Sequence, residues 1–542
     1  MNTQATQLAH GGVRQPTGRT RCVILDQLMR FRFMAALLTL LSSAAFAAPF
    51  VYVGNSSTNE FSVTDMANFK TRVLFPLGGT TRIVANEASE KVFINTSTGI
   101  TILDANNDKV LGKIAIPTPV TDLVADATGN RLYAISGAVV RVIDVVKLKI
   151  IAILTLPAAT LALVADEDGV NAYALTPGKV NVIRARNGAP WTTIPVNQSA
   201  TTLAIDQHGE KLYVASSGPT SANGNLGTAA VTVINTGNFK AEKIIPTAGL
   251  AADVHPNALQ LSPKGDKVYV FGGGSTTTSV KYLVLDTVSG VARAVVVPIT
   301  KSPQFNLTVY SGPTLLSPDG KKLYVGGGSS PNSSQIAEID TATATNTRVL
   351  NMPSNGSEYH YLTGLSSSYT NRRLVLIGFI FEHRIHSAGE PHSVGFVDVD
   401  SGTTLANVTF QQSATSSRLY GDVLDPVDQR EHSTTTVVEG AGSVPLNDTL
   451  TLVARVRGVA PTGRVVFRFV DDTDLTNDQI VRVRVKMNGD SATLTLPGCN
   501  QPWDDAALKK IACTSRFLVS ARYRGDDDNL RSTSQDVVGF RF

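Results

Sequence analysis

The sequence lacks the short motifs that mark the common enzyme classes. It has no Gly-x-Ser-x-Gly nucleophile turn, no His-Glu-x-x-His zinc motif, no Cys-x-x-Cys pair and no phosphate-binding loop. Cysteine itself is scarce, with three residues in 542. No chemistry can therefore be assigned to this chain from a local motif.

Charge is also sparse. Only 17% of the residues are charged and 42% are hydrophobic, a balance that predicts a folded chain. The formal net charge of +4 arises in the first 47 residues, which carry five arginines and one aspartate, and the remainder is formally neutral. A neutral chain gives no reason to expect nucleic-acid binding, and none is predicted.

Residues 1–47 are predicted to be a leader that contains a secretory signal peptide. Two arginines precede the apolar run Phe33–Leu41, which leads into Ala45-Phe46-Ala47, and this order of features is typical of such a peptide. The run is too short to span a bilayer, so no transmembrane segment is expected after cleavage. The alternative is a buried N-terminal helix.

Two cysteines remain after the predicted leader, Cys499 and Cys513. An even pair in an exported chain predicts a disulfide, and the alternative is two free thiols.

A unit with the pattern Gly-x-x-apolar-Tyr recurs in steps of 40, 40, 56 and 55 residues. Strand-type repeats of this period predict an all-β fold, a β-propeller. Each repeat is expected to hold four strands, with a structural aspartate at the end of the third. The repeat glycines are Gly129, Gly169, Gly209, Gly265 and Gly320, and the tyrosines are Tyr133, Tyr173, Tyr213, Tyr269 and Tyr324.

The two ends of the repeat region predict the number of blades. Seven units of first strand and turn occur, and a weaker copy at 419–430 has no strands after it. Residues 50–54 show the complement, because they begin at a second strand. If these fragments share one blade, the ring has eight blades and no free edge; otherwise it has seven. We favour eight.

The clearest repeat reads Ser317-Pro318-Asp319-Gly320-Lys321-Lys322-Leu323-Tyr324-Val325, followed by Ile339-Asp340-Thr341-Ala342-Thr343. It resembles the repeat of YVTN-type β-propellers, and the resemblance covers about 50–433 within the expected propeller domain 48–433 and is weakest at 354–412. The segment 434–542 lacks the repeat, alternates as half-buried strands, and is similar to bacterial Ig-like β-sandwich domains, with an insertion that carries both cysteines. The resemblance implies an extracytoplasmic protein of binding or surface type, and no single chemistry.

Propeller ligands usually sit over the central channel, so the loops into each innermost strand hold the candidate binding residues. Their mixture of hydroxyl, imidazole and guanidinium groups suits a polar or anionic ligand. The alternative is a solvated mouth without a ligand. The candidates are Arg82, Thr121, Thr160, Thr202, His255, Tyr310, His360 and Arg418.

One histidine cluster is a weak candidate for a zinc or copper site. It comprises His383, His386, His392 and Glu390, whose spacing matches known closed sites poorly. The alternative is a solvated loop, and no cofactor is predicted.

These observations predict an exported bacterial protein, secreted or periplasmic or attached to the cell surface. Its expected role is non-catalytic recognition of an envelope or extracellular protein or glycan. One alternative is a propeller enzyme, lactonase-like or quinone-dependent, acting on a small polar substrate. The other is a structural component of a surface layer.

Overall fold

The computed structural model describes residues 49–541 with the exception of several short segments. All described residues belong to the unit Ala48–Phe542, and the predicted leader lies outside them. The segments left out are 57–59, 78, 87–88, 127–128, 167–168, 170, 186, 207–208, 218–228, 248–249, 251–254, 263–264, 274–279, 298–309, 318–319, 331–332, 352–357, 369–372, 383–391, 411–418, 425–433, 472–479, 504–505, 514–515, 524–531 and 536.

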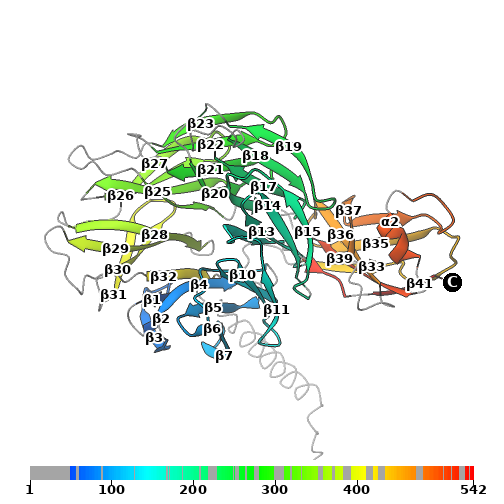
Figure 1. The fold of residues 1–542 in the computed structure, drawn as a ribbon, viewed down its shortest axis with the longest axis horizontal. Helices are drawn as coiled ribbons and strands as arrows, with labels where there is room; N and C mark the ends of the chain where they lie inside the picture. Colours follow the sequence, from blue (N-terminus) through cyan, green and yellow to red (C-terminus); the bar gives the residue numbers. More distant parts are fainter. Residues whose placement is uncertain are drawn as a thin grey trace, which may run out of the picture. The chain divides into compact units, whose positions relative to one another are not determined.

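Within the described residues, eight four-stranded antiparallel sheets form the repeat region (Figure 1). We number them as blades in chain order. The strands are, for blade 1, β1 (Phe50–Asn55), β2 (Glu60–Asp65), β3 (Thr71–Pro76) and β32 (Leu419–Leu424); for blade 2, β4 (Thr80–Asn86), β5 (Lys91–Thr96), β6 (Gly99–Asp104) and β7 (Lys109–Ala115); for blade 3, β8 (Asp122–Ala125), β9 (Arg131–Ser136), β10 (Val139–Asp144) and β11 (Lys149–Thr155); for blade 4, β12 (Ala162–Ala165), β13 (Asn171–Thr176), β14 (Lys179–Arg184) and β15 (Pro190–Pro195); for blade 5, β16 (Ala200–Ile205), β17 (Lys211–Ser216), β18 (Ala230–Asn235) and β19 (Lys240–Pro246); for blade 6, β20 (His255–Leu261), β21 (Lys267–Gly273), β22 (Val280–Asp286) and β23 (Ala292–Val297); for blade 7, β24 (Tyr310–Leu316), β25 (Lys322–Ser330), β26 (Ser333–Asp340) and β27 (Thr345–Asn351); and for blade 8, β28 (Glu358–Ser368), β29 (Arg373–Glu382), β30 (His392–Asp398) and β31 (Thr404–Phe410).

Blade 1 is built from both ends of the repeat region, as the two sequence fragments predict. Strand β1 pairs with β2 on one side and with β32 on the other, so that Tyr52 lies opposite Asp422. The first strands of successive blades contact one another, and β32 contacts both β28 and β4. The ring therefore closes with eight blades, which confirms the predicted propeller. Asp422 strengthens the closure, because its Oδ2 accepts a hydrogen bond from the N–H of Ala85 in blade 2 at 2.9 Å.

The repeat glycines occupy the turn between the first and second strands of a blade. All five have φ between 60° and 68°, the left-handed region in which a Cβ is penalised. The amide of Gly209, for example, closes the turn by donating to the carbonyl oxygen of Asp206 at 2.9 Å. The pattern in the sequence thus reflects a backbone requirement that recurs in these blades.

The repeat tyrosines are buried at the interfaces between blades. Tyr213 donates through its hydroxyl to the carbonyl oxygen of Gly265 in the next blade at 3.5 Å, and Tyr269 donates to that of Thr341 at 3.1 Å. Burial is the main cause that raises the pKa of each of these two phenols to about 12. Both hydroxyls therefore stay protonated at neutral pH, as their role as donors requires.

The aspartates at the ends of the third strands are structural, as predicted. Asp65 accepts a hydrogen bond from the N–H of Ala67 at 2.7 Å, and Asp104 accepts one from Asn106 at 2.9 Å. Further copies hold the same kind of turn in other blades. These copies are Asp144, Asp286, Asp340 and Asp398.

In several blades, the turn that follows the third strand also packs against the blade before it. Phe69 has φ 60° and packs against Phe396 of blade 8, with ring centroids 5.0 Å apart. Phe239 has φ 58° and packs in the same way against Trp191 of blade 4. Blade 4 has a glycine at this position, Gly188, with φ 68°.

We expect the substitution Gly188→Val to lower the free energy of unfolding by about 2 kcal/mol, because a β-branched residue is strained at this φ. A Cβ at this position would also lie 2.3 Å from the Cβ of Ala152 in blade 3. The matched control is Gly137→Val, since Gly137 has φ 59° but a Cβ there meets nothing within 4 Å. Guanidinium denaturation of both variants measures the difference, and equal losses would contradict the proposed clash between blades.

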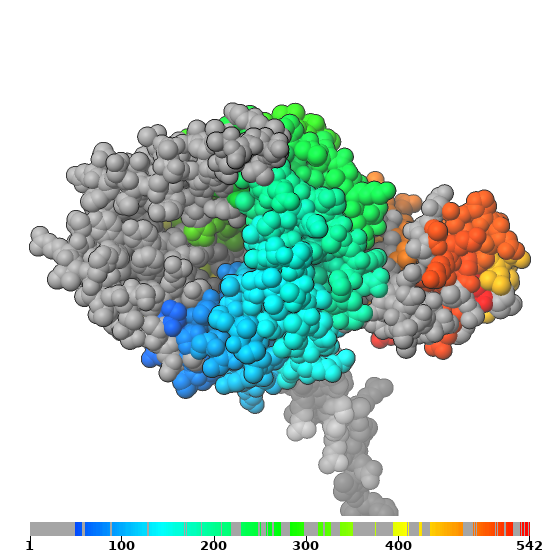
Figure 2. Space-filling model, in the orientation of Figure 1, coloured from blue at the N-terminus to red at the C-terminus, as the bar shows by residue number. Residues whose placement is uncertain are grey.

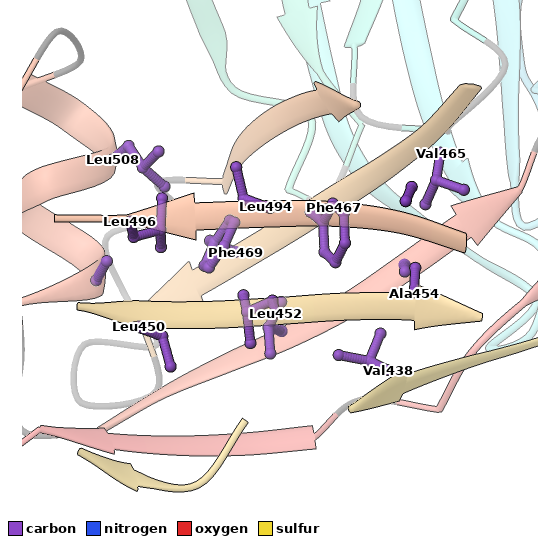
Figure 3. Packing of buried hydrophobic residues seen from close by; sticks show 14 of the residues in the cluster. Val438, Leu450, Leu452, Ala454, Val465, Phe467, Phe469, Leu494, Leu496 and Leu508 are labelled. Carbon is purple, nitrogen blue, oxygen red and sulfur yellow. The ribbon is translucent and has the colours of Figure 1, made fainter. Parts of the chain in front are cut away.

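Strands from Thr435 onward form two further sheets that share no strand with the blades. One sheet contains β33 (Thr435–Glu439), β35 (Leu450–Arg457) and β38 (Ser491–Leu496). The other contains β34 (Ser443–Val444), β41 (Val537–Arg541), β39 (Arg516–Tyr523), β36 (Arg464–Asp471) and β37 (Ile480–Lys486), with β40 (Ser532–Thr533) paired to β39. Alternate side chains of these strands, among them Leu452, Phe467 and Leu494, form a common apolar core (Figure 3).

The predicted disulfide between Cys499 and Cys513 is present, with the two Cα atoms 5.8 Å apart. Helix α2 (Ala506–Ala512) lies in the loop that it closes and packs Leu508 and Ile511 against the core. The strand pattern of the sequence does not predict this helix. In the described part of the chain, no helix is long and apolar enough to cross a membrane.

Candidate binding face of the propeller

Each blade has two ends, and the candidate residues map to one of them. We call this end the mouth face: it carries the beginnings of the first strands and the hairpins that join second to third strands. The opposite face carries the repeat-glycine turns and the turns after the third strands. Blades 2 to 5 form a continuous surface on the side shown in Figure 2.

Arg82 and Asp122 form an ion pair between the first strands of blades 2 and 3. The Nε of Arg82 lies 3.1 Å from the Oδ1 of Asp122, and the two side chains are 51% and 40% exposed. Asp122 is further held by the N–H of Leu123, which donates to the same oxygen at 2.9 Å. The pair presents both a cation and an anion to solvent from rigid strands. Arg82 was a predicted site residue, whereas Asp122 was not.

Thr121 lies directly before β8 and anchors the linker between blades 2 and 3. Its N–H and its hydroxyl both donate to the carbonyl oxygen of Ile135, at 2.7 and 3.1 Å. Thr160 is placed similarly before β12, where its N–H donates to the carbonyl oxygen of Gly137 at 2.9 Å. The Thr160 hydroxyl is buried and has no hydrogen-bond partner among the described residues.

Thr202 in blade 5 is equivalent to Arg82 in blade 2. Each lies two residues before the residue of the first strand that pairs with the buried aromatic of the second strand, Tyr213 or Phe93. A register shift precedes both residues. Because threonine is short, its side chain stays buried, with 8% of the residue exposed. Thr202 therefore offers little surface to a ligand, although it was predicted to lie at the mouth.

The remaining predicted binding residues belong to blades 6 to 8 and blade 1. His255 and Tyr310 begin β20 and β24, and His360 is the third residue of β28. Their backbones therefore lie on first strands as predicted, and their side chains fall outside the described part of the structure. Arg418 lies wholly outside the described residues.

The weak metal candidates fall largely outside the described residues. His383, His386 and Glu390 are in the segment 383–391, and His392 begins β30 with its side chain undescribed. Across the described residues alone, no group of three or more His, Cys, Asp or Glu side chains could hold a metal ion.

Two buried polar residues at the mouth face were missed by the sequence analysis. Asn95 follows the apolar residues of β5 and is 1% exposed. Its Nδ2 donates a hydrogen bond to the carbonyl oxygen of Val120 at 3.4 Å. Its Oδ1 has no hydrogen-bond partner among the described residues. Arg141 lies in β10 and is 7% exposed. For Arg141, the signal available in the sequence was a charged residue between the apolar residues Val140 and Val142 of the third strand.

Comparison with known proteins supports the fold. No protein-family model matches the sequence, and no curated protein matches it. The solved structure of dihydro-heme d1 dehydrogenase NirN in complex with DHE aligns with a TM-score of 0.51 and 13% identity, over 69% of this chain and 76% of that chain. The fold is a β-propeller.

Two further solved structures match with lower scores. The β-propeller domain of Cps50 (Swd1) from Myceliophteria thermophila has 12% identity and a TM-score of 0.41, over 56% of this chain and 93% of that chain. Hydrazine synthase of Kuenenia stuttgartiensis has 13% identity and a TM-score of 0.42, over 62% and 96%. At these identities the likeness concerns the fold alone and assigns no activity.

Proposed function

We propose that this chain is an exported, non-catalytic binding protein whose propeller recognises an envelope or extracellular protein or glycan at the mouth face. In this proposal residues 1–47 are a leader removed on export, 48–433 form a YVTN-type propeller, and 434–542 form an Ig-like sandwich. The sandwich acts as a spacer or as a second contact.

The observation that carries the proposal is the Arg82–Asp122 pair. Both side chains lie at the mouth face on adjacent first strands and are about half exposed. Each can therefore give up its contact with water, or with the other side chain, and bind a charged group of a partner. Charged groups at the edge of a contact surface select partners and fix their orientation. The closed ring of packed blades keeps the two strands in register, which suits recognition without rearrangement.

The disulfide supports export. Disulfides persist in oxidising compartments outside the cytoplasm, and Cys499–Cys513 is formed here.

Capture of a partner tests the proposal. The purified exported chain is immobilised and exposed to a solubilised envelope fraction, and bound protein and sugar are identified by mass spectrometry and sugar analysis. We expect Arg82→Glu to reduce the captured partner at least tenfold, because it places two carboxylates side by side at the mouth.

Lys149→Glu is the matched control, since Lys149 is exposed and begins β11 at the opposite face. It changes the charge equally and should leave capture unchanged. The proposal would be contradicted if both variants lost captured partner equally, or if no partner were enriched over the blank.

A further inference from the structure

Arg141 points into the interface between blades 2 and 3. Alternate side chains of a strand share a face, and Ile143, two residues further along β10, belongs to the apolar cluster between these blades. The guanidinium thus lies beside an apolar interface, with only 7% of the residue exposed. A buried charge of this kind normally has a counter-charge.

Among the described residues, Arg141 has no carboxylate partner. Its Nη1 donates to the Oγ of Ser136 at 3.2 Å, and this is its one hydrogen bond to described residues. Nε and Nη2 have no partner there, yet neither atom is sealed from solvent. These two nitrogens form the edge of the guanidinium that binds two oxygens of a carboxylate or phosphate at once.

The position does not require a charge for the fold. It lies three residues before the end of the third strand, and every other blade has a neutral residue there. These residues are Ser62, Thr101, Asn181, Thr232, Leu283, Ala337 and Gly395. The neutral asparagine in blade 4 is satisfied internally, since its Nδ2 donates to Ala174 and to Thr176. Arg141 is therefore an addition to the repeat rather than part of it.

A series of hydrogen bonds connects Arg141 to Asn95, whose buried Oδ1 has no hydrogen-bond partner among the described residues. Arg141 bonds to Ser136, which follows Ile135, the acceptor of both bonds from Thr121. The residue before Thr121 is Val120, whose carbonyl oxygen accepts from Asn95. This chain of contacts leads from the buried guanidinium to the linker that directly precedes Asp122 of the exposed ion pair.

We propose that the edge of the interface between blades 2 and 3 at the mouth face is an oxyanion-binding subsite, in which Arg141 holds a carboxylate or phosphate group through Nε and Nη2. The inference rests on the proposed function, because it assigns an anionic group to the ligand of the mouth face. The apolar surroundings strengthen the interaction, since charges attract more strongly where water is excluded.

Calorimetric titration of the whole purified chain tests this subsite. Sodium phosphate and sodium acetate are titrated separately at fixed ionic strength, with sodium chloride as the reference. We expect saturable binding of at least one of the two oxyanions, weakened at least tenfold by Arg141→Met; the arm that binds identifies the oxyanion. Arg455→Met removes an equal charge from an exposed pair with Glu439 and should leave the affinity unchanged.

Arg141→Lys provides a second test of the subsite if the methionine variant does not fold. It retains the charge but lacks the two-nitrogen edge, so the preference for oxyanions over chloride should fall at least tenfold. No saturable binding by the unmodified chain, or equal affinity in the Arg141 variants, would overturn the subsite. If a partner is captured but no oxyanion binds, only the subsite is disproved. If an oxyanion binds but no partner is captured, only the proposed partner is disproved.

Discussion

Replacing Glu338 with alanine should lower the free energy of unfolding of the propeller by about 3 kcal/mol at pH 7. Glu338 is 3% exposed in β26, and its carboxylate accepts hydrogen bonds from Arg348 at 2.7 and 2.9 Å. Lys322 lies 3.0 Å from the other oxygen. Removal of the carboxylate leaves two cations without their counter-charge. Because the side chains of Arg348 and Lys322 remain 27% and 33% exposed, the expected loss of unfolding free energy is at the lower end of the range for breaking a buried ion pair.

The effect reaches beyond blade 7. The Nη1 of Arg348 donates to the carbonyl oxygen of Asp400 in blade 8 at 2.8 Å, and its Nη2 donates to that of Val399. Glu338 therefore orients an arginine that joins two blades. Unfolding by guanidinium, followed by the fluorescence of the chain, measures the loss.

The stabilisation by Glu338 should depend on pH. Burial alone would raise the pKa of this carboxyl, but the hydrogen bonds from Thr347, Arg348 and Lys322 outweigh it and hold the pKa below its ordinary value. A carboxyl with a lowered folded-state pKa stabilises fully above its unfolded pKa, about 4.3 for glutamate. The difference between the unmodified chain and Glu338→Ala should thus be constant near neutrality and shrink as the pH falls below about 4.

Glu242→Ala is the comparison for this experiment. Glu242 pairs with Lys211 at 3.7 Å, and both side chains are more than a third exposed. Exposed pairs contribute at most about 1 kcal/mol, so this variant should change little. A loss at Glu242 equal to that at Glu338 would show that burial of the pair is not the cause.

The architecture could be predicted because each turn and interface repeats a local requirement. Gly209 needs a left-handed backbone, and Tyr213 fills the interface and donates to the next turn. Such requirements leave a period in the sequence whatever lies in the loops. The composition of blade 1 from both ends of the repeat region was predictable for a related reason, since a closed ring needs β1 and β32 to complete one sheet.

The candidate site was less predictable, because it depends on contacts between blades. Whether a residue after the register shift is exposed depends on its length: Arg82 reaches solvent, whereas Thr202 does not. The role of Arg141 was hidden because a strand pattern does not reveal which neighbours meet its guanidinium. Helix α2 was missed because it is one short element, stabilised by core contacts and a disulfide rather than by its own pattern.

Removing the disulfide should destabilise the C-terminal sheets by about 3 kcal/mol, as expected for a closed loop of this length. The cysteines are 14 residues apart and enclose α2, whose Leu508 and Ile511 are buried in the core. The double variant Cys499→Ser and Cys513→Ser frees that loop in the unfolded state and loosens the helix in the folded state. Calorimetry of the whole chain should show one transition moved to lower temperature, while stability changes in the blades, such as that of Gly188→Val, should not move it.

Reductant should produce the same shift in the unmodified chain and none in the double variant. An equal response of both proteins to reductant would rule out the disulfide as the cause of the shift.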